Sequence, residues 1–188
     1  VKDAVDAAFV DGVTPVAVLV SNGVYVLTAA ITVDKDLTLR GVNGSAVTRL
    51  AYTSRIDRVL NLNSSNAVVE GLTLSGGYTV GYGGGIYLQA GTVTNCRVDH
   101  CWATSRGGGV YMTGGTLRNC QIITNECYDR TWNWGGGIYM SAGQVLDCIV
   151  SGNVTGETAG GGGHGYGGGI YLQGGLVRNS LVVSNLVY

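Results

Sequence analysis

The sequence predicts an all-β fold, a parallel β-solenoid in which one short coil repeats along an axis, and three observations lead to this prediction. A glycine-rich phrase occurs four times, starting at Gly83, Gly107, Gly135 and Gly167. Each phrase opens a frame of 19 residues that is followed by a segment of variable length. Apolar residues alternate over short runs within the frame, which is typical of strands and not of helices. A fixed frame with one variable segment indicates a solenoid.

Composition narrows the classes of protein to which the chain can belong. The 188 residues suffice for one domain, with 45% hydrophobic and only 12% charged residues. The 33 glycines with a single proline argue against collagen and against a proline-rich linker. A net charge of −1 gives no basic surface for nucleic acid. No apolar run approaches the ~20 residues of a membrane span. We expect a single domain over residues 1–188.

Residues 1–12 are expected to form an N-terminal cap. Apolar residues recur there at helical spacing, at Val1, Ala4, Val5, Ala8 and Phe9. A short amphipathic helix in this position would cover the open end of the first coil, and a solenoid needs such a cap.

Residues 16–82 are expected to form irregular first coils. Short alternating strands are separated by turn signals at Asn22-Gly23 and Asn43-Gly44. The segment 66–77 already aligns with the later frame, because Leu72 matches Cys96 and Leu74 matches Val98.

Residues 83–188 contain the four repeats. Coils stack at ~4.8 Å, so each aligned position becomes a column along the solenoid. Three apolar columns are expected to point inward: Ile86, Val110, Ile138, Ile170; Leu88, Met112, Met140, Leu172; and Val98, Ile122, Val150, Val182. A small inward column contains Cys96, Cys120, Cys148 and Ser180. Arg97 alternates with these positions, so we expect it to point outward, where reversal of its charge should have little effect.

Two polar columns are expected at turns. One contains Asn95, Asn119, Asp147 and Asn179, and the other contains Cys101, Asn125, Asn153 and Asn185. Asparagine tolerates left-handed backbone, and stacked amides can pair between coils. The glycines are interpreted as turns that also allow close approach of the coils. The alternative, a dinucleotide cradle suggested by "GYGGGI", lacks a following helix and an acidic partner.

These repeats resemble the right-handed parallel β-helices of the pectin-lyase-like superfamily. Within it, the chain is similar to "GGGIY…TNC…SGN" repeat proteins of bacterial surfaces, related in style to autotransporter passengers and polymorphic outer-membrane proteins. The resemblance covers essentially the whole chain and implies about seven coils and an exported bacterial protein. It implies no activity, because this superfamily carries enzymes, adhesins and structural stalks.

No catalytic or metal-binding motif is apparent in the sequence. The acidic residues are scattered, and Asp99 is one of them. His100 and His164 have no cysteine or aspartate at ligand spacing, so we expect no metal and no cofactor. Cys101 and Cys127 fall at the edges of adjacent repeats, and a disulfide between them is left open.

Binding residues are expected on the variable segments, all of which leave the frame at the same corner and form one rim. All three tryptophans lie there, and we expect them to approach one another. The candidate binding residues are Tyr82, Trp102, Arg106, Tyr128, Arg130, Trp132, Trp134, His164 and Tyr166. A second aromatic column, Tyr87, Tyr111, Tyr139 and Tyr171, faces outward. Both sets either stabilise neighbouring coils by stacking or offer a surface to a glycan or a protein.

The sequence therefore favours a non-enzymatic, exported, cell-surface module of the stalk or adhesin kind, with a glycan or a surface protein as partner. The alternative is a polysaccharide-active enzyme: a lyase, hydrolase or epimerase. The last inward column has nothing stacked on it after Asn185. We expect either a fragment of a longer chain or end-to-end self-association through the C-terminal coil.

Overall fold

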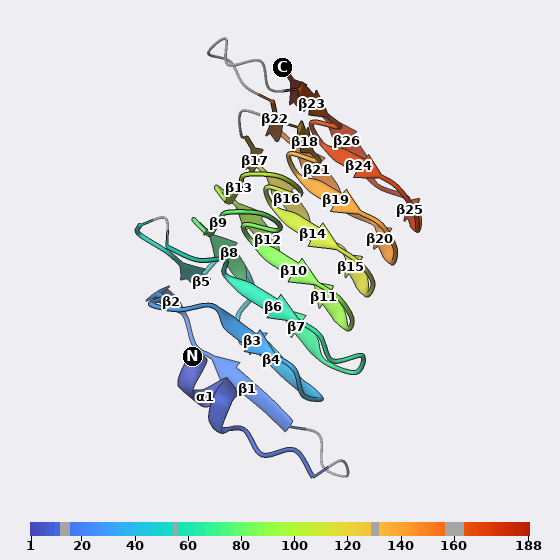
Figure 1. The fold of residues 1–188 in the computed structure, drawn as a ribbon. Helices are drawn as coiled ribbons and strands as arrows, with labels where there is room; N and C mark the ends of the chain where they lie inside the picture. The colour runs from blue at the N-terminus through green and yellow to red at the C-terminus, as the bar shows by residue number, and fades with distance from the viewer. Residues whose placement is uncertain (12–15, 55, 129–131, 157–163) are drawn as a thin grey trace.

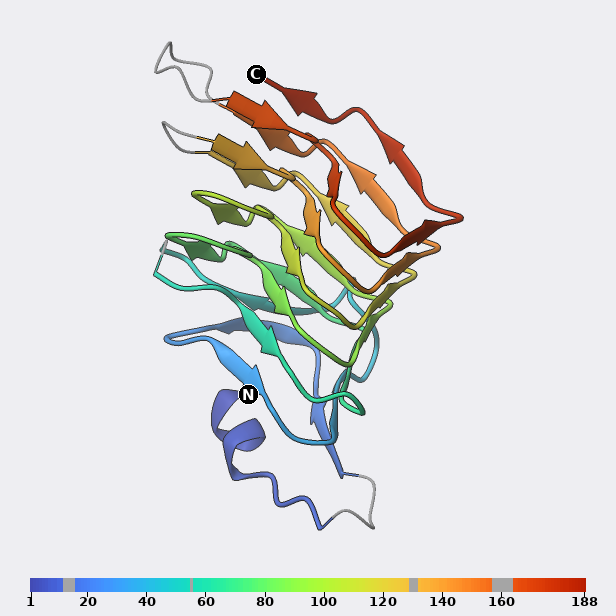
Figure 2. The ribbon, with the colours of Figure 1, turned by 45° about the vertical axis from the view of Figure 1, so that its right-hand side comes forward.

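The structure is a computed structural model that describes residues 1–188 except 12–15, 55, 129–131 and 157–163. It is a parallel β-solenoid whose coils stack along one axis, with the helix α1 (Lys2–Ala7) at the N-terminal end (Figures 1 and 2). Every strand pairing is parallel and joins a strand to its equivalent in the neighbouring coil.

Four sheets run along the solenoid, and each complete coil visits them in the order C, A, B, D. Sheet C contains β3 (Ile31–Val33), β6 (Leu60–Leu62), β10 (Ile86–Leu88), β14 (Val110–Met112), β19 (Ile138–Met140) and β24 (Ile170–Leu172). Sheet A contains β1 (Val16–Val20), β4 (Leu37–Gly41), β7 (Val68–Glu70), β11 (Thr92–Thr94), β15 (Thr116–Arg118), β20 (Gln144–Leu146) and β25 (Leu176–Arg178).

The other two long sheets complete the coil. Sheet B contains β2 (Gly23–Val26), β5 (Thr48–Ala51), β8 (Thr73–Ser75), β12 (Arg97–Asp99), β16 (Gln121–Ile123), β21 (Ile149–Ser151) and β26 (Leu181–Val183). Sheet D contains β9 (Tyr78–Thr79), β13 (Trp102–Ala103), β17 (Glu126–Cys127), β22 (Val154–Thr155) and β27 (Leu186–Val187). A two-stranded sheet E joins β18 (Trp132–Trp134) to β23 (His164–Tyr166).

The number of complete turns is smaller than predicted. Five coils, beginning at β6, β10, β14, β19 and β24, place a strand in each of the sheets C, A, B and D. The two earlier coils, β1–β2 and β3–β5, have no strand in sheet D among the described residues. The predicted number of about seven counted these incomplete coils, which lack the regular frame.

The predicted inward columns are confirmed. Ile86 lies opposite Val110, and Val98 lies opposite Ile122, in register with their equivalents in the following coils. These side chains are buried in one continuous core that also contains the thiols of Cys96, Cys120 and Cys148. Because every coil repeats the same inward positions, the core extends along the axis as a stack of layers.

The polar turn columns also form as predicted. Asn95, Asn119, Asp147 and Asn179 all have left-handed backbone, with φ between 50 and 57°. The first glycine of each phrase has a similar φ, between 63 and 69°. The second glycine allows close approach, because a Cβ on Gly108 would lie 2.2 Å from the Glu126 carbonyl oxygen. Any larger residue there would clash with backbone.

The cap packs on the first coils through one apolar contact and one lysine. Val5 of α1 is fully buried in the core. The Lys35 Nζ donates hydrogen bonds to the carbonyl oxygens of Asp6 and Ala8, at 2.9 and 3.0 Å, near the C-terminal end of the helix. In the described part of the chain, no helix is long and apolar enough to cross a membrane.

Candidate functional site

An aromatic and cationic column runs along the corner where the variable segments rejoin the frame. Bridges link Tyr82 to Arg106 and Arg106 to Trp134, and Trp134 lies in register with Tyr166 across sheet E. The Arg106 guanidinium carbon lies 5.4 Å from the Tyr82 ring centroid and 5.0 Å from that of Trp134. Cation–π attraction thus ties three successive coils together at this corner.

The outward tyrosines on sheet C form a second column beside the first. Tyr111 and Tyr139 stack with centroids 5.1 Å apart, and Tyr139 and Tyr171 stack at 5.4 Å. The Arg106 guanidinium also lies over Tyr139, at 5.1 Å. Tyr111, Tyr139 and Tyr171 cover one another face to face, whereas Tyr87 meets Tyr111 edge to face, at 69°. The column therefore stabilises neighbouring coils by ring stacking, and it offers a ligand mainly the edges of its rings.

Trp132 has described ring contacts with the later coil only. Its described ring contacts are with His164 at 4.9 Å and Tyr166 at 5.8 Å, both in the later coil. The strand β18 has its partner β23 in that same later coil. Toward the earlier coil, the pairing of the described residues is limited to the bridge between Arg106 and Trp134. Trp132 remains 50% exposed.

This arrangement creates a step in the surface, which we define by Trp132, Trp134, His164 and Tyr166. The segment before Gly107 has five residues, Trp102–Arg106, whereas the segment before Gly135 has nine, Glu126–Trp134. Trp132 belongs to the longer segment and lies on β18, whose strand partner is β23 in the later coil. Trp132 and Trp134 lie two residues apart on one strand face, and both stack on Tyr166, with interplanar angles of 14 and 17°.

Trp102 belongs to a different ring cluster. Its described ring contacts are with Tyr78 at 6.5 Å and Tyr128 at 5.7 Å, around sheet D. The prediction that all three tryptophans approach one another therefore describes Trp132 and Trp134 but not Trp102. The physical reason is that Trp102 is held in β13 by its strand partners, before the chain reaches the variable part of the segment.

Two further predictions from the sequence concern Arg130 and the disulfide between Cys101 and Cys127. Arg130 lies outside the described residues. Cys101 and Cys127 are both buried free thiols, so the disulfide left open by the sequence is not formed. Cys127 lies in register with Ala103, whereas Cys101 heads the asparagine column, where its backbone N–H donates to Asn125 Oδ1 at 3.0 Å.

A charged cluster on the outer face of sheet B was missed by the sequence analysis. Asp99 is only 1% exposed although its strand position points outward. Its Oδ1 accepts hydrogen bonds from Ser75 Oγ at 2.5 Å and Arg49 Nη2 at 3.2 Å, and His100 Nδ1 lies 3.3 Å from the same oxygen. Its Oδ2 accepts from Arg97 Nε at 2.6 Å. We call these residues the Asp99 cluster.

The structure argues against the prediction that charge reversal at Arg97 has little effect, because Arg97 holds a buried carboxylate. Burial acts to raise the pKa of Asp99, but hydrogen bonds from Ser75, Arg97 and His100, together with the charge of Arg49, outweigh it and lower the pKa below its ordinary value. Part of the signal was available in the columns, since Ser75 aligns with Asp99, whereas Arg49 is brought into register with Arg97, through Thr73, only in the structure.

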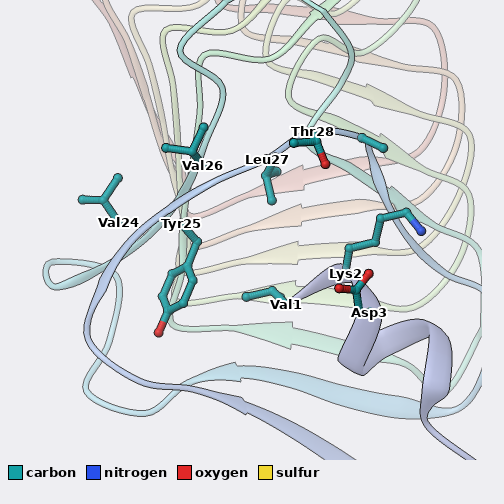
Figure 3. Close-up of a pocket in the computed structure, with 9 residues that line it drawn as sticks. Val1, Lys2, Asp3, Val24, Tyr25, Val26, Leu27 and Thr28 are labelled. Carbon is teal, nitrogen blue, oxygen red and sulfur yellow. The ribbon is translucent and has the colours of Figure 1, made fainter.

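A cavity of about 360 Å³ lies at the opposite end of the molecule, between α1 and β2 (Figure 3). Its walls include Val1, Lys2 and Asp3 of the cap region and Tyr25 and Leu27 of the first coil. This cavity is the seam between cap and solenoid, and none of the rim residues lines it. Among the described residues, no group of three or more histidine, cysteine or carboxylate side chains is placed to hold a metal ion.

No family model, curated protein or solved structure matches the chain in the three comparisons made. Function must therefore be argued from the surface itself.

Proposed function

We propose that the chain is a non-enzymatic binding module that takes a glycan at the step formed by Trp132, Trp134, His164 and Tyr166. The observation that carries the proposal is the half-exposed indole of Trp132, supported from behind by His164 and Tyr166. The finer expectations of a pectin-lyase-like relationship, of export and of a place on a bacterial surface belong to this proposal. They are supported by the repeat phrase alone.

The chemistry of a sugar ring fits such a surface. One face of a pyranose ring exposes C–H groups and is apolar, whereas its rim carries hydroxyls. The flat face of Trp132 can pack against the C–H face, while His164 and Tyr166 support the opposite face of the indole. Because the indole is already stacked on the later coil, little side-chain entropy is lost when a ligand binds.

The test is a glycan-array screen of the 188-residue chain followed by calorimetry on the best glycan. Trp132→Ala removes the half-exposed indole and should weaken binding by about 2 kcal/mol, roughly thirtyfold in Kd. Phe9→Ala is the matched control, because Phe9 is an exposed aromatic residue in the N-terminal region and its loss should leave Kd unchanged.

Two outcomes would reject the proposal. Wild-type affinity of Trp132→Ala for every glycan bound by the parent would exclude the step as the site. Release of reducing ends or of unsaturated products from any bound polysaccharide would instead support the alternative, a polysaccharide-active enzyme.

A further inference from the structure

The Asp99 cluster contains more cationic donors than its carboxylate uses. Arg49 and Arg97 bring two positive charges to the single negative charge of Asp99. Within the described residues, Asp99 is the one carboxylate paired with either guanidinium. One positive charge therefore remains uncompensated on the outer face of sheet B, before any protonation of His100 is counted.

The hydrogen bonds of each arginine leave some of its N–H groups available to an anion. A guanidinium has five N–H bonds arranged as a rigid fork. Asp99 holds Arg97 through Nε, and the described hydrogen bonds leave Nη1 and Nη2 of Arg97 unused. The Arg97 side chain is 38% exposed. Arg49 uses Nη2 toward Ser75 and Asp99, and its side chain is 40% exposed.

His100, which the cluster also holds in place, becomes a third donor when its imidazole is protonated, because only then do both ring nitrogens carry N–H groups. Its Nδ1 lies 3.3 Å from Asp99 Oδ1, which leaves Nε2 directed away from the carboxylate, and the side chain is 63% exposed. A cavity of about 210 Å³ opens beside it, lined by Tyr52, Thr53, Ser54, Gly76, Gly77, His100 and Trp102. The cavity adjoins the imidazole alone, because neither Arg49 nor Arg97 lines it.

We infer that the Asp99 cluster is a binding site for a tetrahedral oxyanion, a sulfate or phosphate group, held by Arg97, Arg49 and His100. Asp99 serves as a positioning residue: it fixes both guanidinium groups and the imidazole, and its own oxygens are already occupied. Arginine is well suited to this role because its free Nη pair can bond two oxygens at once.

A tetrahedral oxyanion suits the placement of the donors. Arg49 lies on β5, Arg97 on β12, and His100 in the turn that follows β12, so the three groups approach from different elements. A tetrahedral group presents oxygens in several directions and can meet all three donors. A planar carboxylate has only two oxygens, both in one plane, and can bond fewer of these three donor groups. The site is separate from the step at Trp132, and the inference does not depend on the proposed function.

The experiment uses sodium sulfate as the probe, titrated into the 188-residue chain at constant ionic strength maintained with sodium chloride. The Arg97 Nε–H and the His100 ring are followed by NMR. We expect saturable shifts of both signals with sulfate and with phosphate, and at least tenfold weaker binding of acetate. Arg97→Gln should weaken sulfate binding by about tenfold, the effect of one lost charge-assisted contact.

Arg118→Gln is the matched control. Arg118 is a half-exposed arginine on the neighbouring sheet A, paired with Asp147 at 3.4 Å, and its replacement removes the same charge. It should leave sulfate binding unchanged. His100→Asn keeps a residue that tolerates the left-handed turn, φ 52°, while it removes the imidazole, and it should also weaken binding.

Three results would overturn the inference: shifts with chloride alone that match those with sulfate, equal binding of acetate and sulfate, or equal loss in Arg97→Gln and Arg118→Gln. Trp132→Ala should bind sulfate like the parent chain. Loss of sulfate binding and loss of glycan binding are therefore expected in different variants, Arg97→Gln and Trp132→Ala.

Discussion

At the scale of single residues, Asp99 shows how stacking can bury an outward strand position. Its carboxylate lies on the outer face of sheet B, yet Arg49, Arg97 and His100 from three elements cover it almost completely. The cost of removing the charge from water is offset by hydrogen bonds from four donors. The cluster spans the coils of β5, β8 and β12 and so connects the irregular first coils to the regular repeat.

We predict that Asp99→Asn lowers the free energy of unfolding by about 2 kcal/mol at pH 7, because hydrogen bonds to a charged acceptor are lost. The folded-state pKa of Asp99 is lowered, so its contribution is present above the unfolded value of about 3.9 and is lost as pH falls through the folded value. The stability difference between wild type and variant should therefore shrink below about pH 4.

Urea unfolding at several pH values measures this difference. Asp34→Asn is the control, because Asp34 is exposed and its replacement should change stability by less than about 0.5 kcal/mol. A difference between wild type and Asp99→Asn that stays constant from pH 7 to pH 3 would contradict the assigned role of the carboxylate.

At the scale of elements, the inner asparagine column is the most regular polar feature. Asn153 Oδ1 accepts from the backbone N–H and the side-chain Nδ2 of Asn125, at 2.9 and 3.0 Å. Its own Nδ2 donates to the Ile122 carbonyl oxygen at 2.8 Å and to Asn185 Oδ1 at 2.9 Å. Each amide thus satisfies buried groups of two neighbouring coils at the corner between sheets B and D.

Asn153→Ala should lower the free energy of unfolding by about 3 kcal/mol, because it leaves several buried polar groups without partners. Asn61→Ala is the matched control. Asn61 lies on the outer face of β6 and donates to Thr32 Oγ1 at 3.3 Å near the surface, so its loss should cost less than about 1 kcal/mol. Equal midpoints of urea unfolding for the two variants would show that the column does not contribute in the way described.

At the scale of the whole molecule, the two ends of the solenoid differ. At the N-terminal end, α1 packs against β3 and buries Val5. At the C-terminal end, residues of the inward columns are exposed, Leu172 to 51% and Val182 to 44%, whereas their equivalents Met112 and Ile122 are fully buried. Strands β24 to β27 also present open edges, because each is the last strand of its sheet.

We therefore predict that the 188-residue chain self-associates through this coil, since open strand edges and exposed apolar side chains favour pairing. Light scattering as a function of concentration should show association, and Val182→Lys should reduce it by placing a charge in the contact. Val80→Lys serves as the control, because Val80 is exposed to 80% in the segment before the first repeat phrase. A monomer at the highest concentration, for wild type as for Val182→Lys, would show that the open coil does not pair.

The sequence by itself determined the repeat, the inward columns, the left-handed turns and the asparagine column. It could do so because each coil of a solenoid contacts only its neighbours, so aligned residues such as Val98 and Ile122 must stack in register. The same reasoning placed Tyr82, Arg106, Trp134 and Tyr166 in one column. Where the frame has constant length, residues that align in the sequence are also neighbours in space.

Only the tertiary structure decided what happens where the frame is irregular. Arg49 lies in the first coils, which do not carry the repeat phrase, so its approach to Asp99 depends on the path of the chain and on the reach of a long side chain. Trp102 was separated from Trp132 because Trp102 is paired in sheet D, in register with Glu126, whereas Trp132 lies on β18 in sheet E. In both places the contact depends on chain geometry that local periodicity does not contain, and both candidate binding sites depend on such contacts.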